Sequence, residues 1–131
     1  MSQPDDDRSI LDSDPLWRRI HPDQVVPDGK GAWRASSAAF TDSSDGTGMS
    51  VTLGREARAA GMDPRLALQR FPRFGLASVA AGVCRAHDQA IQRDPTKDDP
   101  HHALVNGDKP KRVQRALAKA AHLLIRPLPA E

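Results

Sequence analysis

Turn-forming residues divide this chain into short segments, and this division constrains the fold more than any other feature of the sequence. Two runs have turn composition, Asp28-Gly29-Lys30-Gly31 and Asn106-Gly107. Pro22 and Pro27 confine the apolar pair between them to a short extended piece. Short segments joined by short links favour antiparallel strands. We therefore expect an α+β domain, with a small mixed, mainly antiparallel sheet, short helices and a carboxy-terminal amphipathic helix.

The periodicity of apolar residues predicts where the elements lie. The expected strands cover residues 16–20, 25–26, 36–40, 49–53, 76–85, 90–93 and 101–105, with an edge strand at 123–125. Residues 76–85 also fit a helix, but 90–93 would give them a hairpin partner, so we favour a strand. The expected helices cover residues 55–60, 63–71 and 108–124, because Asp63-Pro64 and Asp108 with Pro110 have the chemistry of helix starts.

The length of 131 residues fits one domain with its own core. Hydrophobic residues make up only 38% of the chain and Tyr is absent, so Ala, Val, Leu and Ile must form that core. A thin core of this kind gains from burial against a partner protein or in a homo-oligomer. Residues 1–15 are acidic and aperiodic, which predicts a disordered acidic arm followed by a single α+β domain over residues 16–131.

Several classes of site and location are disfavoured by what the sequence lacks. Cys84 is the only cysteine, so neither an intramolecular disulfide nor a cysteine zinc site can form. No apolar run approaches the ~20 residues that cross a bilayer, and the acidic amino terminus does not resemble a signal peptide. We expect a cytoplasmic protein without membrane contact, metal or cofactor.

The candidate ligand site is a set of cationic and hydroxyl side chains in two apolar runs, 16–21 and 33–40. Guanidinium groups bind phosphate or carboxylate in a two-pronged geometry, and hydroxyls can complete such sites. If residues 33–40 form a strand, Ser36 shares a face with Arg34 and Ser37 does not. The residues predicted to bind the ligand are Arg18, His21, Arg34, Ser36, His101 and His102.

His101 and His102 raise the question of a metal, which their spacing disfavours. Adjacent strand residues point to opposite faces of a sheet, so both rings cannot ligate one ion without distortion of the backbone. One of them, with His21 and Arg34, would suit the acid-base chemistry of a metal-independent ribonuclease.

The leading hypothesis is an accessory domain that binds a partner protein or an anionic ligand through the Arg/Ser face. One alternative is a small toxin-like enzyme acting on RNA or NAD. For NAD, the residue order resembles that of ADP-ribosyltransferase-type toxins, with Glu56 as the acidic residue. Whether the protein is an enzyme stays open at this point.

A second alternative is a non-specific nucleic-acid binder. Apolar residues recur at helical spacing near the carboxy terminus, and the opposite side of that helix is basic. Its cations are Lys111, Arg112, Arg115 and Lys119. Against this alternative, the chain is poor in aromatic residues that could stack on bases, and its acidic arm would repel DNA.

Four runs together resemble a set of small bacterial proteins that are usually described as hypothetical. They read Leu-Trp-Arg-Arg-Ile-His-Pro from Leu16, Arg-x-Ser-Ser-Ala-Ala-Phe from Arg34, Met-Ser-Val from Met49 and His-Ala-Leu-Val from His102. The resemblance spans residues 16–127. It implies a small intracellular bacterial protein and transfers no catalytic residue.

Overall fold

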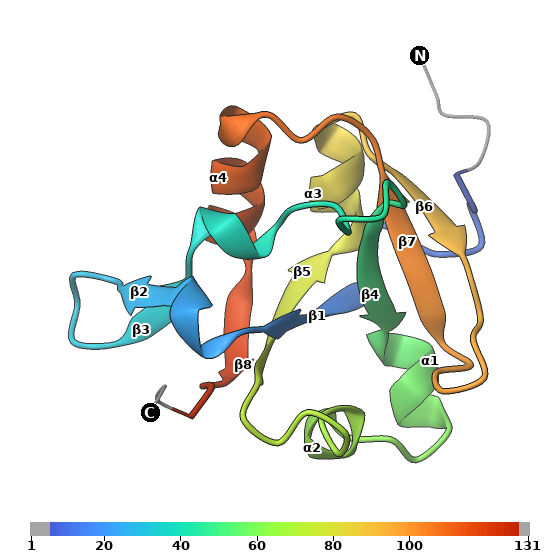
Figure 1. Cartoon of the computed structure of the whole chain (residues 1–131). Coiled ribbons are helices and arrows are strands. Elements are labelled where there is room, and N and C mark those ends of the chain that lie inside the picture. Colours follow the sequence, from blue (N-terminus) through green and yellow to red (C-terminus); the bar gives the residue numbers. More distant parts are fainter. Residues whose placement is uncertain (1–5, 129–131) are drawn as a thin grey trace.

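A six-stranded antiparallel sheet forms the centre of the computed structural model, which describes residues 6–128 (Figure 1). The strand order is β6-β7-β4-β1-β5-β8, and every neighbouring pair is antiparallel. The strands are β1 (Pro15–Ile20), β4 (Met49–Leu53), β5 (Gly75–Ala80), β6 (Ala90–Arg93), β7 (His102–Asn106) and β8 (His122–Ile125). The expected α+β fold with a mainly antiparallel sheet is confirmed.

The remaining elements are short. A separate hairpin pairs β2 (Val25–Pro27) with β3 (Trp33–Ala35). The helices are α1 (Gly54–Ala59), α2 (Pro64–Ala67), α3 (Ala81–Ala86) and α4 (Lys111–Ala120), and two 3-10 turns are η1 (Pro22–Gln24) and η2 (Ser37–Ala39). Within residues 6–128, no helix has the length and apolar character needed to cross a membrane.

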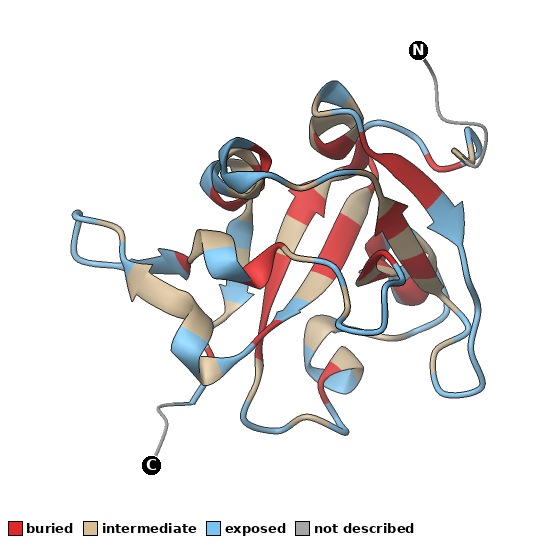
Figure 2. Ribbon diagram, turned by 45° about the horizontal axis from the view of Figure 1, so that its top comes forward, coloured by how far each residue is buried: buried red, intermediate tan, exposed pale blue. Residues whose placement is uncertain are grey.

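The two faces of the sheet bury different amounts of apolar surface. Along β4, buried and less buried residues alternate, as Figure 2 shows for the central strands. Leu16 and Ile20 of β1 belong to a large core that includes residues of η2, α3 and α4. Trp17, on the opposite face, belongs to a much smaller cluster with residues of α1 and the end of α2. We call these the packed face and the hollow face.

The amino-terminal segment is docked on the domain from Asp6 onward, which differs from the expected disordered arm. Ile10 is buried in the large core. The Asp6 carboxylate accepts hydrogen bonds from the Arg85 guanidinium and from the Ile91 amide. Acidic side chains of this segment therefore form ion pairs with arginines of the domain. Residues 1–5 of the predicted arm lie outside the described part.

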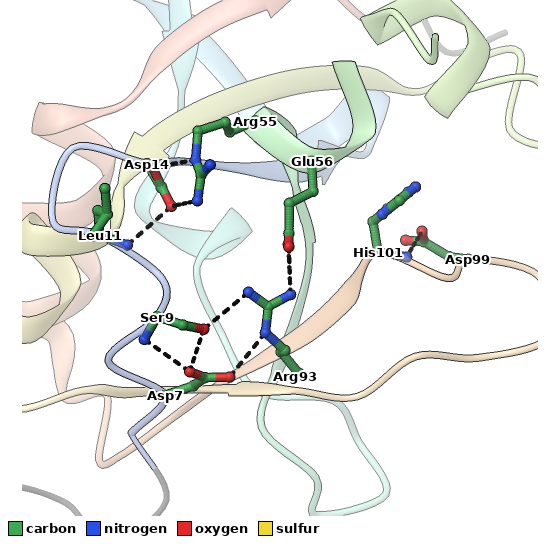
Figure 3. A network of polar contacts seen from close by, with 9 residues as sticks. All are labelled: Asp7, Ser9, Leu11, Asp14, Arg55, Glu56, Arg93, Asp99 and His101. Carbon is green, nitrogen blue, oxygen red and sulfur yellow. Dashed lines mark hydrogen bonds and ion pairs between the residues drawn. The ribbon is translucent and has the colours of Figure 1, made fainter. Parts of the chain in front are cut away.

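Figure 3 shows a second set of contacts that holds this segment. Arg93 of β6 donates to Asp7 Oδ2 at 2.9 Å and to both carboxylate oxygens of Glu56 at 2.7 Å. Arg55 of α1 binds the buried carboxylate of Asp14 at 2.8 and 3.1 Å. These ion pairs join the segment to α1 and to β6.

The predicted strand over residues 76–85 is correct only in its first half. The chain turns at Ala80, and Ala81–Ala86 form α3. The amino-terminal segment supplies acceptors for the free amides of this helix: Ala81 donates to the Asp14 carbonyl and Gly82 to the Asp12 carbonyl. The predicted hairpin with residues 90–93 is also wrong, because β6 pairs with β7.

Two helix boundaries also differ from the prediction. Asp63 does cap α2, accepting from the Leu66 amide at 2.9 Å, but the helix ends after one turn. The helix α4 begins at Lys111 with Pro110 as its N-cap, so Asp108 plays no capping part. The expected edge strand near the carboxy terminus is present as β8, paired with β5.

The stretch that the sequence presents as a strand at residues 36–40 is a 3-10 turn. The strand β3 ends at Ala35, Ser36 is the N-cap residue of η2, and the Ala39 and Phe40 amides donate to the carbonyls of Ser36 and Ser37. Ala39 and Phe40 are buried in the large core. The prediction that Ser36, but not Ser37, shares a face with Arg34 assumes a strand here, and that assumption is wrong.

Candidate functional site

A groove of about 560 Å³ lies where the β2–β3 hairpin and η2 meet α4. The residues lining it are Val26, Arg34, Ser36, Ser37, Arg115, Ala118 and Lys119. It combines the two basic features that the sequence presents separately, the Arg/Ser stretch and the cationic helix. We call it the basic groove.

The fold positions each wall of the basic groove by burial of neighbouring residues. Arg34 is paired with Val26 across the hairpin. Ala39 and Phe40 anchor η2 in the large core, and Leu117 anchors α4 in the same core. Since Arg115 and Lys119 are four residues apart on α4, they lie on the same side of the helix.

The electrostatics of the basic groove are one-sided. Among residues 6–128, no carboxylate lines it. Arg34 donates to the neighbouring Ala35 carbonyl at 3.2 Å. Within residues 6–128, neither Arg115 nor Lys119 has a carboxylate partner, and Arg34 has none either. Like charges four residues apart on a helix repel each other, so a bound anion would relieve a cost that the free protein carries.

Arg18, in contrast, is a structural residue of the packed face. Its guanidinium donates to the carbonyls of Ala39 at 2.9 Å, Ser50 at 2.9 Å and Thr41 at 3.3 Å. Burial lowers the pKa of this guanidinium to about 10, with a smaller contribution from the charge of Arg19. The N–H groups of Arg18, which the sequence predicts to bind a ligand, therefore donate to backbone carbonyls of the chain itself.

The predicted histidines lie apart from the basic groove. His21 caps η1 by accepting the Asp23 amide at its Nδ1, and its ring meets Phe74 edge-on at 5.3 Å. His101 donates its backbone amide to Asp99 Oδ1, as Figure 3 shows. His102 lines a different cavity, on the hollow face. Of the six predicted residues, the structure brings together Arg34 and Ser36.

The groove adds three polar residues to that pair: Ser37, Arg115 and Lys119. The sequence contains the signal for Ser37, since two serines before a short apolar run fit the start of a turn as well as a strand. Arg115 and Lys119 were grouped with Lys111 and Arg112 as one basic helix face. The groove separates them, because Lys111 and Arg112 do not line it.

Two side chains with catalytic chemistry elsewhere in the chain, Glu56 and Cys84, are engaged or buried. The Glu56 carboxylate binds Arg93. Cys84 is buried, and burial raises the pKa of its thiol to about 12, so it is not an activated nucleophile. Within the described residues, no three His, Cys, Asp or Glu side chains are grouped to hold a metal ion.

Comparisons with known proteins identify no relative of this chain. No protein-family model matches it, and neither the curated proteins nor the solved structures contain a significant match.

Proposed function

We propose that this protein binds an anionic, phosphate-bearing ligand in the basic groove. The observation that carries this proposal is the convergence of Arg34, Arg115 and Lys119 on a groove that no carboxylate of the described residues lines. The proposal keeps the predicted Arg/Ser face but replaces Arg18 with two cations from α4.

The charge of the groove favours phosphate over carboxylate. The groove has three cations without a carboxylate partner in the described chain. A phosphate group carries up to two negative charges near neutral pH and therefore balances these cations better than a single carboxylate does. Arginine can bind two phosphate oxygens at once, and the hydroxyls of Ser36 and Ser37 can donate to the others.

The contents of the groove support binding and give no support to catalysis there. In the part of the chain that the structure describes, its lining holds neither a histidine nor a carboxylate that could act as a general acid or base. The ribonuclease and NAD alternatives would need such a group beside the anion.

Calorimetric titration with inorganic tripolyphosphate tests the proposal directly. We expect binding that weakens as salt concentration rises, because the contacts are charged and exposed. The double variant Arg34→Gln/Arg115→Gln removes two cations from the groove and is expected to weaken binding about tenfold or more.

Lys111→Gln/Arg112→Gln is the matched control. It also removes two cations. Both lie on α4, but neither lines the groove. We expect this control to change affinity by less than about threefold through long-range charge alone. Equal losses in both double variants would show binding to the helix as a whole, and the absence of tripolyphosphate binding would refute the proposal.

A titration with a short single-stranded oligonucleotide separates a local phosphate site from a nucleic-acid surface. A polyanion that follows all of α4 would depend equally on Lys111, Arg112, Arg115 and Lys119. A ligand confined to the groove would depend on the last two and on Arg34.

A further inference from the structure

A second cavity, of about 400 Å³, lies on the hollow face of the sheet. Trp17 and Arg19 of β1, Thr52 of β4 and His102 of β7 contribute to its walls. They share a face because Trp17 is paired with Thr52, and Thr52 with His102, across antiparallel strands. Residues of and around α2 cover it from the other side. We call this cavity the hollow.

The hollow has an apolar side and a polar side. Trp17, Leu76 and Met62 supply apolar surface, and Trp17 and Leu76 are almost fully buried. Beside Trp17, Thr52 donates its hydroxyl to Asp99 Oδ2 at 2.6 Å, which fixes the loop that leads into β7. A volume of this size is at the lower end of small-molecule sites, so a small amphipathic ligand is the matching class.

Among the arginines that line the hollow, Arg19 is held in place without a hydrogen-bond acceptor in the described chain. Its guanidinium carbon lies 3.9 Å from the centroid of the Phe71 ring. Such stacking orients the guanidinium while leaving its N–H groups at the edge. Within residues 6–128, no carboxylate or carbonyl accepts a hydrogen bond from Arg19, whereas the adjacent Arg70 is paired with Asp98 at 2.8 Å.

Burial and the neighbouring charges act on Arg19 in different directions. Asp98 and Asp99 also line the hollow, but Asp98 is paired with Arg70 and Asp99 accepts the Thr52 hydroxyl. Burial lowers the pKa of Arg19, the nearby Asp99 carboxylate raises it in part, and the positive charge of Arg70 lowers it again. An oxyanion that accepts hydrogen bonds at the edge of the Arg19 guanidinium would offset the hydration that burial removes.

His102 provides a second oriented polar group. Its Nδ1 lies 2.9 Å from the Asp94 carbonyl oxygen and 3.1 Å from Asp94 Oδ2. Since a carbonyl oxygen can only accept, Nδ1 carries the hydrogen, and the neutral ring then has its lone pair on Nε2. The ring is therefore fixed both in orientation and in tautomer at the wall of the hollow.

We propose that the hollow is a second ligand site, separate from the basic groove, and that it binds a small molecule with one oxyanion on an apolar body. The oxyanion lies at the Arg19 guanidinium and the apolar body lies against Trp17 and Leu76. A carboxylate and a phosphate monoester share this chemistry.

The test is a ¹H–¹⁵N NMR titration that uses the two tryptophans as reporters. Phenylacetate and phenyl phosphate are the two oxyanion probes. We expect at least one of them to shift the indole signal of Trp17 and the amide of Thr52, while the indole of Trp33, on the hairpin beside Arg126, stays in place. Acetate and inorganic phosphate lack the apolar body and are expected to bind more weakly, by about tenfold at least.

Two arginine variants make the assignment specific. Arg19→Gln is expected to weaken binding about tenfold or more. Arg58→Gln is the matched control, because Arg58 also lies over an aromatic ring on this face, 5.3 Å from the Trp17 ring centroid, but does not line the hollow. We expect it to leave affinity unchanged.

The outcomes distinguish this proposal from the proposed function. No Trp17 shift with either oxyanion probe, equal binding of the cation phenethylamine, or full affinity in Arg19→Gln would overturn the hollow as an oxyanion site. A shift with only one oxyanion probe would support the site and identify its headgroup. Arg34→Gln/Arg115→Gln is expected to leave these shifts intact, whatever its effect on tripolyphosphate.

Discussion

Arg18 and Arg19 are neighbours on β1, yet they project from opposite faces of the sheet into different surroundings. On the packed face, Arg18 gives its hydrogen bonds to three carbonyls of its own chain. On the hollow face, Arg19 stacks on Phe71 and has no acceptor in the described chain. An arginine in a small domain can thus serve as a structural clamp or as an oriented donor for a ligand, and its surroundings decide which.

The same contrast holds for the two faces as a whole. The packed face joins strands, α3, α4 and η2 in one apolar core, whereas the hollow face retains a cavity with polar walls. Stability should therefore depend mainly on the packed face, and small-ligand binding on the other.

The largest expected effect comes from removing the same side chain from a helix on each face. Leu117 of α4 is fully buried in the packed core, and Leu66 of α2 is 49% exposed beside the hollow. Leu117→Ala is expected to lower the free energy of unfolding by about 3 kcal/mol, and Leu66→Ala by less than about 1 kcal/mol. Urea denaturation measures both, and similar losses would contradict the distinction between the faces.

A smaller difference is expected between the two arginines. Arg18→Met leaves three carbonyls without their donor and should lower the free energy of unfolding by about 2 kcal/mol. Arg19→Gln removes no hydrogen bond within residues 6–128 and should change it by less than about 0.5 kcal/mol. Chemical denaturation of the two variants checks this order, and a larger loss for Arg19→Gln would identify it as a structural residue.

The smallest expected effect concerns the docked amino-terminal segment, which borders the packed face through Ile10. Burial alone would raise the pKa of the Asp14 carboxyl, but hydrogen bonds from Arg55 and from the Leu11 amide lower it below 3.8 overall. A carboxyl with a lowered folded pKa stabilises the fold above pH 3.8 and loses that contribution as the pH falls through its folded pKa.

Asp14→Asn should therefore lower stability by about 1 kcal/mol at neutral pH and should lose less than the wild type on acidification. Thermal melts from pH 7 to pH 3 measure the difference. Curves that stay parallel throughout this range would show that Asp14 is not one of the groups that link stability to pH.

Much of the secondary structure could be predicted because it depends on local signals. Gly61 adopts a φ of +87° just after α1, where a glycine was expected to end the helix, and Asp63 caps α2 as its sequence indicates. Residues 76–85 were harder, since Ala and Val fit strand and helix alike. There the carbonyls of Asp12 and Asp14, distant in the chain, decide that Ala81 begins a helix.

The candidate site was predictable only in part for the same reason. Arg34 and Ser36 could be grouped because they are two residues apart, and Arg115 and Lys119 because they are one helical turn apart. That the two pairs share a groove depends on how η2 and α4 pack, and no short spacing encodes it. The alternation that excluded Ser37 failed because the strand ends at Ala35.

The sequence by itself determined the α+β class, the antiparallel sheet, most turns and the supply of cations. These follow from residue periodicity and from backbone preferences that act over a few residues. Only the tertiary structure decided the partner of each charge: Asp6 with Arg85, Arg18 with carbonyls, and Arg19 with an aromatic ring. The physical reason is that charge and hydrogen-bonding energies depend on distance and burial, and packing between segments far apart in the chain sets both.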